Sequence, residues 1–376
     1  MRSLELFSGC GGLAKGLELA GFEHCAFVEF NKWACESLRA NFDPKLVHET
    51  DIREFDFASV GKVDLIAGGP PCQPFSLGGL AKAYEDSRDM FPQAIRAIHE
   101  LTPRGFVFEN VKGLLRQSFA DYFEYIILRL TFPEKVQPVG ISWQEHLAEL
   151  RAMDFASYGG LKYDVQYKLV NAVDYGVPQC RERVFIVGLR NDLGLKWNWP
   201  EKLGGRMTIA DAIGDLPDAQ TENSLGDHVF VDGAREYPGH TGSDYNQPSK
   251  TIKAGAHGVP GGENMIRFPD GTLRYMTVHE AKLIQTFPGD YHVCGSWGEA
   301  LRQIGNAVPV RLAKVMGEQL RRTLSAVGHR KVAYKTDAAG NFLLFEKHNK
   351  KKSTVAEKRS MKSGDKHKKI KYQHHG

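Results

Sequence analysis

The sequence predicts an α/β fold in which a doubly wound, mostly parallel Rossmann-like sheet stands beside a smaller, irregular module. Short apolar runs alternate with helix-like segments over the first third of the chain. From about residue 190 to 272 this pattern breaks up into a stretch rich in Gly, Pro, Asp and Asn. Alternating strands and helices are typical of a parallel sheet covered by helices, and 376 residues allow one large domain or two medium ones.

The first third of the chain supplies the expected sheet. The predicted strands are Leu4–Phe7, Ala26–Glu29, Val63–Ala67 and Phe106–Phe108. The predicted helices cover Leu13–Ala20, the residues from an Asn31 cap to about Asn41, and Met90–Leu101 behind Asp89. In such sheets ligands bind beyond the carboxyl ends of the strands. We therefore expect the residues that follow these strands to share one cleft.

Later elements differ in kind. Tyr163–Val173 and Arg183–Leu189 look like an antiparallel pair. Thr277-Val-His-Glu280 is a capping box that opens a helix to about residue 286, and Ser296-Trp-Gly-Glu299 repeats the device. The last periodic helix is expected over Val310–Val327.

Composition and charge narrow the class of protein. The chain begins with a strand-like segment and not with a secretion signal, and it has no apolar stretch of membrane-spanning length. Its six cysteines are scattered without a CxxC pair, so we expect reduced thiols in a cytoplasmic protein and no metal site. Residues 346–376 hold eleven basic and three acidic side chains, a net charge of +8, whereas the whole chain carries +4. This end is predicted to be a disordered arm that either binds phosphates or only aids solubility.

A glycine-rich loop lies between the first expected strand and the first expected helix. It reads Phe-Ser-Gly-Cys-Gly-Gly-Leu-Ala over residues 7–14, and Glu29 follows Gly9 by twenty positions. Glycines allow a cofactor to approach the backbone closely, and an acid at this spacing binds ribose hydroxyls. The pattern predicts a nucleoside cofactor, with a plain tight turn as the alternative.

A proline-flanked cysteine follows the third expected strand. The segment reads Gly-Pro-Pro-Cys-Gln-Pro-Phe-Ser over residues 69–76. Prolines stiffen the backbone on both sides of Cys72, which suits a nucleophile that must meet one atom at one angle. The alternative is a half-buried cysteine in a turn.

Three further motifs carry polar groups. Glu109-Asn110-Val111 ends the fourth expected strand. The Glu109 carboxyl group there suits proton donation, and the alternative is that it only caps a helix. Alternation along a strand puts Gln179, Arg181 and Arg183 on one face, which suits an anionic or planar ligand or a solvated edge strand. The same alternation points Cys180 to the opposite face, where we expect it to be a packing residue. Gln303–Pro309 either returns the chain to the cofactor pocket or forms a helix-entry turn.

Together these motifs resemble the cytosine-specific DNA methyltransferases that make 5-methylcytosine, over roughly residues 3–320. In order they are Phe7–Gly12, Glu29, Asp51, Pro70-Pro71-Cys72-Gln73, Glu109-Asn110-Val111, Gln179 with Arg181 and Arg183, a variable region, Arg274–Phe287 and Gln303–Pro309. The resemblance implies an S-adenosylmethionine-dependent methyltransferase fold with that cofactor as the methyl donor. It implies binding residues as follows: Phe7 and Phe30 beside the adenine, Glu29 on the ribose, Asp51 on the exocyclic amine, and Gly9, Gly11, Gly12 and Asn306 along the methionine part. Phe30 stands where the family often has tryptophan.

The resemblance also implies a mechanism. The Cys72 thiolate attacks carbon 6 of a flipped-out cytosine, and carbon 5 then takes the methyl group. Glu109, with Asn110 beside it, bonds ring nitrogen 3 and stabilises the enamine. Arg183 contacts the base oxygen and Arg181 supports the same site. Flipping is required because carbon 6 is inaccessible inside the stacked duplex.

The family pattern also divides the chain. Residues 1–189 with 300–330 are expected to form the catalytic and cofactor-binding domain. Residues 190–299 are expected to form a small domain whose variable part, about 190–272, recognises a specific site in double-stranded DNA, and residues 331–376 form the basic tail. We expect a monomer of the bacterial or phage type. The recognised site, any partner restriction enzyme, the base that removes the carbon-5 proton and the role of Thr131–Asp154 do not follow from the sequence.

Three other functions stay open from the residues. A transfer RNA methyltransferase on the same scaffold is one, although the long variable module disfavours it. A catalytically silent DNA-binding regulator is the second, which the intact Cys72, Glu109 and Arg183 disfavour. A nicotinamide-dependent oxidoreductase is the third, and it leaves the proline-flanked cysteine unexplained.

Overall fold

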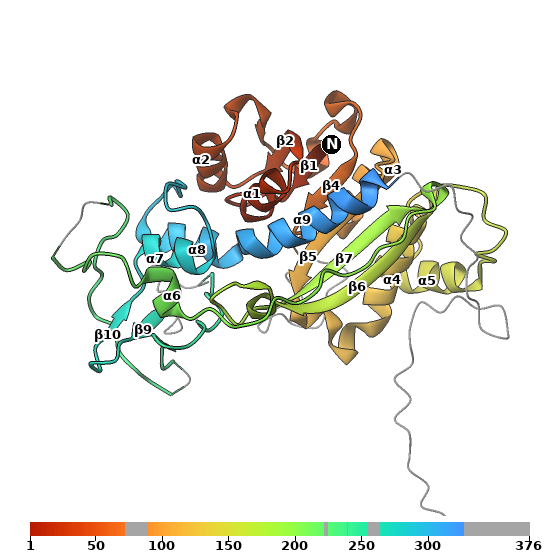
Figure 1. Ribbon diagram of the computed structural model, residues 1–376. Coiled ribbons are helices and arrows are strands. Elements are labelled where there is room, and N and C mark those ends of the chain that lie inside the picture. Colours follow the sequence, from red (N-terminus) through yellow and green to blue (C-terminus); the bar gives the residue numbers. More distant parts are fainter. Residues whose placement is uncertain (72–88, 222–224, 239, 255–263, 327–376) are drawn as a thin grey trace, which may run out of the picture. The chain divides into compact units, whose positions relative to one another are not determined.

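Seven strands form the central sheet of the protein, whose computed structural model describes residues 1–71, 89–221, 225–238, 240–254 and 264–326 (Figure 1). The first five strands in sheet order are parallel, and β7 runs antiparallel to both of its neighbours. The doubly wound, mostly parallel sheet is therefore confirmed. In sheet order the strands are β3 (Val47–Glu49), β2 (Glu23–Glu29), β1 (Arg2–Leu6), β4 (Leu65–Gly68), β5 (Gly105–Val111), β7 (Glu182–Arg190) and β6 (Tyr163–Asn171).

Helices cover both faces of this sheet. Val107 of β5 and Val187 of β7 pack in one core with Leu17 and Leu320, from helices α1 (Gly12–Leu19) and α9 (Val310–Ser325). On the other face Tyr167 of β6 stacks edge-on against Phe123 of α4 (Ala120–Thr131), with 4.7 Å between ring centroids. The apolar strands are buried on both sides, as parallel strands with helical crossovers require.

Helices α1 and α9 lie side by side because small residues line their contact (Figure 1). A Cβ atom at Gly16 would lie 2.3 Å from the Cβ of Ala313, and one at Gly317 would lie 2.8 Å from the Cβ of Ala20. Side chains at these two positions would force the helices apart. The close approach brings the start of α9 to the glycine-rich loop that precedes α1.

The remaining helices extend the predicted set. Helix α2 (Lys32–Asn41) begins at Asn31, whose side chain accepts from the Ala34 N–H as predicted, and α3 (Phe91–Leu101) follows Asp89. Helices α4 and α5 (Trp143–Ala152) were not predicted; α5 opens with a capping box between Ser142 and Glu145. Short 3₁₀ turns cover Pro44–Leu46, Ile52–Glu54, Phe57–Val60, Lys112–Leu115, Gln117–Phe119, Ala172–Tyr175 and Asn191–Leu193.

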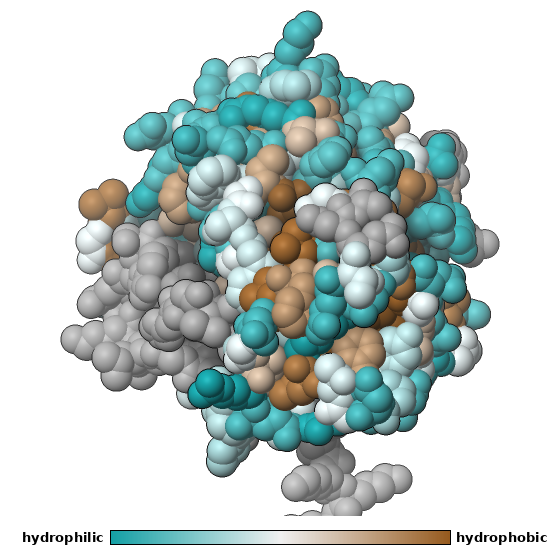
Figure 2. All heavy atoms as spheres, turned by 90° about the vertical axis from the view of Figure 1, so that its left-hand side faces the viewer, coloured by the Kyte–Doolittle hydropathy of each residue, from teal (hydrophilic) through white to brown (hydrophobic). Residues whose placement is uncertain are grey.

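A second, small sheet belongs to the irregular part of the chain. Its order is β10 (Leu273–Tyr275), β9 (Met265–Arg267), β8 (Ser243–Asp244). An apolar cluster of its own joins Ile252 and Ile266 to α6 (Ile209–Ile213), α7 (Val278–Ile284) and α8 (Trp297–Asn306). Figure 2 looks at the end of the protein that carries this sheet, where apolar side chains gather near the middle of a mostly hydrophilic face.

One of the two predicted capping boxes is wrong. Thr277 and Glu280 form theirs at the start of α7. At α8 the Ser296 side chain makes no capping hydrogen bond, and the Glu299 carboxylate pairs with Arg302, with 2.6 Å between Oε1 and Nη2. A charged partner one turn along the helix outcompetes the backbone N–H for this carboxylate.

By its contacts, Met1–Val332 forms one unit and Ala333–Gly376 a second, which lies outside the described residues. In the described ranges, no helix combines the length and apolar character needed to cross a bilayer.

Candidate active site at the carboxyl ends of the strands

Five adjacent parallel strands end in residues that the sequence singled out. Phe7 follows β1, Glu29 closes β2, Asp51 follows β3, Gly69 follows β4 and Val111 closes β5. Parallel strands place these residues along one edge of the sheet. The glycine loop, Glu29 and Glu109 thus lie at the same edge, whereas the prediction that they share one cleft with Cys72 stays a prediction, since Cys72 lies outside the described residues.

Glu29 is the anchor of the glycine-rich loop. Its Oε2 accepts from the Gly9 N–H at 2.8 Å, and its Oε1 accepts from the N–H groups of Phe30 (3.0 Å) and Asn31 (2.8 Å). One carboxylate thus ties the end of β2 to the loop after β1. Gly9 has a φ of +53°, and a Cβ there would meet nothing within 4 Å, so the loop presents bare backbone to open space.

The glycine loop also contacts the chain just after α8. A Cβ at Gly12 would lie 2.3 Å from the Val308 carbonyl oxygen, so only glycine fits between the loop and this segment. The Tyr291 hydroxyl donates to the Cys10 carbonyl at 2.6 Å and fastens the loop from a second side. The return of Gln303–Pro309 to the glycine loop was predicted. Tyr291 was missed because no local pattern marks a tyrosine whose partner lies 281 residues away.

Three more of the predicted cofactor residues are Phe30, Asp51 and Asn306. Phe30 is 76% exposed, and Asn306 is exposed at the end of α8. Asp51 pairs with Arg53, with 2.6 Å between Oδ2 and Nη2. The hydrogen bonds from the Arg53 side chain and N–H hold the pKa of the Asp51 carboxyl below its usual value. Their contacts with a cofactor stay predictions.

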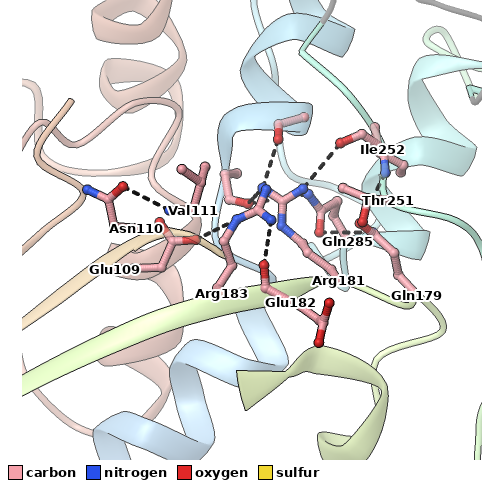
Figure 3. Close-up of polar contacts among 12 residues, drawn as sticks. Glu109, Asn110, Val111, Gln179, Arg181, Glu182, Arg183, Thr251, Ile252 and Gln285 are labelled. Carbon is pink, nitrogen blue, oxygen red and sulfur yellow. Dashed lines mark hydrogen bonds and ion pairs between the residues drawn. The ribbon is translucent and has the colours of Figure 1, made fainter. Parts of the chain in front are cut away.

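Glu109 and Arg183 form a buried ion pair (Figure 3). The antiparallel register of β5 and β7 sets Arg183 opposite Val111, which brings its Nε to 2.9 Å from Oε1 of Glu109. Burial raises the pKa of the Glu109 carboxyl, although the charges of Arg183 and Arg181 oppose the rise. Burial likewise lowers the pKa of Arg183. A carboxyl group with a raised pKa is suited to hold or deliver a proton.

Asn110 connects this pair to the segment that leads into Cys72. Its Nδ2 donates to the Pro70 carbonyl at 2.9 Å, and its Oδ1 accepts from the Val111 N–H at 2.9 Å. The end of β5 therefore positions the backbone two residues before Cys72. Cys72 itself, with the rest of residues 72–88, lies outside the described residues.

Arg181 is turned to backbone and not to open space. Its Nη1 donates to the Ile252 carbonyl at 3.2 Å, and its Nη2 donates to the carbonyls of Gly305 (2.8 Å) and Ala307 (3.0 Å) (Figure 3). The side chain is only 1% exposed. It joins the start of β7 to the small sheet's cluster and to the segment that contacts the glycine loop.

Gln179 adds to the same junction, whereas Cys180 does not pack. Gln179 donates to Oε1 of Gln285 at 3.1 Å and accepts from the Ile252 N–H at 3.1 Å. The prediction that Cys180 is a packing residue is wrong, because its side chain is exposed. The alternation itself holds, since Gln179 and Arg181 are buried and Cys180 between them is exposed, but the buried side is the polar one. Gln285 was missed, because its contacts link distant segments.

We expect Arg181→Met to destabilise the protein strongly. Three buried carbonyls lose a charged donor, and each unmet buried group costs about 1–3 kcal/mol, so a loss of about 3–5 kcal/mol in the free energy of unfolding is expected. Urea unfolding measures it. Arg322→Met is the matched control, since that arginine is exposed on α9. A loss no larger than the control's would show that the three contacts contribute little.

No group of three or more potential metal ligands occurs among the described residues.

Comparisons with known proteins show which family this chain is similar to. A family model described as C-5 cytosine-specific DNA methylase matches residues 1–132 and 149–322 and leaves residues 133–148 unmatched. The Type II methyltransferase M.PspPI of Psychrobacter sp. (strain TA137) is 36% identical over 362 residues, which cover 86% of this chain and 79% of that protein. M.NgoMIV of Neisseria gonorrhoeae, also a Type II methyltransferase, is 34% identical over 335 residues, covering 86% and 97%.

Solved structures share the fold. A putative DNA modification methyltransferase encoded within an E. coli prophage superposes with a TM-score of 0.62 at 22% identity, covering 87% of this chain and all of that one. The Dnmt2 methyltransferase of S. pombe superposes with a TM-score of 0.59 at 17% identity, covering 86% and 98%.

Proposed function

We propose a covalent mechanism for this chain, which belongs to the C-5 cytosine-specific DNA methylase family and is a DNA (cytosine-5-)-methyltransferase. In this proposal the protein takes the methyl group from S-adenosylmethionine. It methylates a cytosine in a specific duplex site through a covalent adduct with Cys72. The observation that carries the proposal is the buried Glu109–Arg183 pair, held next to the segment that leads into Cys72. Family membership decides against the oxidoreductase and the silent regulator that the sequence left open.

The edge formed by the glycine loop and Glu29 fits S-adenosylmethionine. A carboxylate offers about four acceptor positions, and three of those on Glu29 are taken by backbone N–H groups. We propose that the remaining position accepts one ribose hydroxyl. The exposed ring of Phe30 is available to stack on the adenine, with Phe7 on its other side and Asp51 on the exocyclic amine. Gly9, Gly11, Gly12 and Asn306 would border the methionine part. When bound, the cofactor supplies the electrophilic methyl group.

The protein's own groups divide the chemistry on the base. We propose that the Cys72 thiolate bonds carbon 6 of the flipped cytosine, while the protonated Glu109 donates to ring nitrogen 3 and stabilises the enamine. Arg183 orients Glu109 and contacts the base oxygen. Asn110 acts as a positioning residue through the Pro70 carbonyl, and Arg181 supports the site through the backbone segments that it joins.

DNA recognition is proposed to lie in the small domain, residues 190–299, with catalysis in residues 1–189 and 300–330. The separate sheet of the small part supports this division, while its apolar cluster also takes in Ala300, Leu301 and Ile304 of α8, just past residue 299. The variable stretch 190–272 holds none of the catalytic motifs. Apolar side chains grouped on a hydrophilic face are typical of interaction surfaces (Figure 2). The net charge of +8 on residues 346–376 supports a role for the tail 331–376 in phosphate contact.

A methyl-transfer assay tests the proposal. Labelled methyl from S-adenosylmethionine should pass to duplex DNA and not to transfer RNA, and methylome sequencing of a host that expresses the chain should reveal 5-methylcytosine at one short site. Transfer to transfer RNA alone would instead support the alternative substrate on the same scaffold.

Glu29→Ala should weaken S-adenosylmethionine binding by roughly 1–3 kcal/mol, because a charged acceptor for ribose and the anchor of the glycine loop are both lost. Calorimetry without DNA measures this change. Glu23→Ala is the matched control, since Glu23 is exposed at the other end of β2. Binding of NAD in place of S-adenosylmethionine by the unmodified protein would overturn the cofactor assignment.

A further inference from the structure

A cavity of about 670 Å³ lies on the face of the sheet that α4 covers. Helices α3 and α4 and the segment that leads into α5 form its walls. Its volume is within the range of small-molecule sites. Among the described residues that line it there is no member of the glycine loop, of the Glu109–Arg183 pair or of the Arg181 junction. Among the described residues, the cavity therefore shares no lining side chain with the candidate active site.

One wall of the cavity lies outside the match to the family model. The family model leaves residues 133–148 unmatched, and Val136, Gln137, Trp143 and Gln144 from this stretch line the cavity. The capping box at Ser142 fixes the start of α5 and hence the position of Trp143. An addition to the family core thus closes a space that α3 and α4 alone would leave open.

A buried arginine lies in the cavity wall. Arg129 of α4 is 6% exposed, and its Nη1 donates to the Tyr125 hydroxyl at 3.0 Å. Its Nε is buried without a hydrogen-bond partner among the described residues, and within the same ranges no carboxylate pairs with this guanidinium. A buried cation without a counter-charge is costly, and an anion brought to it would relieve that cost.

The other charged groups of the cavity are already engaged. Arg96 donates to the carbonyls of Ile52 and Phe55 and to Glu100, and Asp89 accepts from the Tyr122 hydroxyl. His99 lines the outer part of the wall, where it is exposed. The site therefore offers one unmet cationic donor and one acid that is already hydrogen-bonded, which favours a ligand with a single negative charge.

Apolar and aromatic side chains form much of the remaining lining, among them Phe91, Ile95, Ile126 and Trp143. Such walls favour a flat apolar body, and the planar guanidinium pairs best with a carboxylate. We propose that this cavity is a binding site for a small aromatic carboxylate, whose acid group pairs with Arg129 and whose ring packs against Ile126 and Trp143.

A matched pair of probes tests the proposal on the full-length protein. Calorimetry should show saturable one-to-one binding of 2-naphthoate and at least tenfold weaker binding of its neutral isostere 2-naphthamide, because only the acid pairs with Arg129. Equal affinity for acid and amide, or no saturable binding of the acid, would overturn the proposal without any variant. Binding only of peptides that carry an aromatic acidic end would assign the cavity to a protein partner and likewise overturn it.

Variants locate the site. Arg129→Met should weaken 2-naphthoate binding at least tenfold while leaving 2-naphthamide binding unchanged, and Arg129→Lys should be intermediate. Arg151→Met is the control, because Arg151 is exposed on α5 and pairs with Asp121 and Glu124 outside the cavity. Methyl transfer and thermal melting report that each variant is folded. Unchanged 2-naphthoate affinity in a folded Arg129→Met protein would rule the cavity out.

Discussion

Cys72→Ser is expected to lower the rate of methyl transfer by several orders of magnitude while leaving the affinities for DNA and S-adenosylmethionine nearly unchanged. A serine hydroxyl is far less ionised near neutral pH than a thiol, and the thiolate is the attacking species. Single-turnover transfer of labelled methyl measures the loss, and equilibrium binding shows that the complex still forms.

Cys180→Ser is the matched control for this experiment. Cys180 is a free cysteine whose exposed side chain lies in the segment before β7. Its replacement should leave turnover close to that of the unmodified protein. Substantial turnover by Cys72→Ser would sink the covalent mechanism, and an equal loss in both variants would point to general thiol damage instead.

Glu109→Gln should lower the rate of the chemical step by about 10²–10⁴-fold, the range expected for a lost proton donor. The amide still bonds a polar partner but delivers no proton to ring nitrogen 3. Because burial raises the pKa of Glu109, the protonated form persists to higher pH than for an ordinary glutamic acid. The unmodified rate should therefore contain a limb that declines as the pH rises through this raised pKa, and the variant should lack it.

Glu182→Gln is the control for the Glu109 variant. Glu182 is the first residue of β7, and its exposed carboxylate pairs with Lys112, with 2.7 Å between Oε2 and Nζ. We expect its replacement to change neither the rate nor its pH profile by much, because exposed pairs contribute little. A normal rate for Glu109→Gln would assign the proton chemistry to another group.

The same raised pKa predicts how stability depends on pH. A carboxyl group whose pKa is higher in the folded than in the unfolded state stabilises the fold fully below the unfolded pKa, and this contribution is lost as the pH rises through the folded pKa. The pH range over which this stabilisation is lost begins near 4.5, the ordinary pKa of a glutamic acid side chain. Across it the unmodified protein should lose stability relative to Glu109→Gln, as measured by urea unfolding. A constant difference would show that burial does not shift this group.

Much of the fold and part of the site were predictable because their signals are local. Apolar runs marked β1, β2, β4 and β5, and the side chains of Asn31 and Thr277 cap helices through N–H groups three residues away. The rule that ligands bind beyond the carboxyl ends of parallel strands then brought Glu29 and Glu109 to one edge. Local competition also explains a failure: at Ser296 the same capping pattern yields to Arg302.

By itself, then, the sequence determined the α/β class, the order of the motifs and the edge of the sheet where they meet. Only the tertiary structure decided what each polar group does there. The register of β5 against β7 pairs Arg183 with Glu109, whereas Arg181, two residues earlier, turns to the carbonyls of Ile252, Gly305 and Ala307. The cavity beside Arg129 likewise exists only because a segment outside the family core folds over α3 and α4. Such contacts join residues that are far apart in sequence, and their energies depend on burial and distance, which no local pattern encodes.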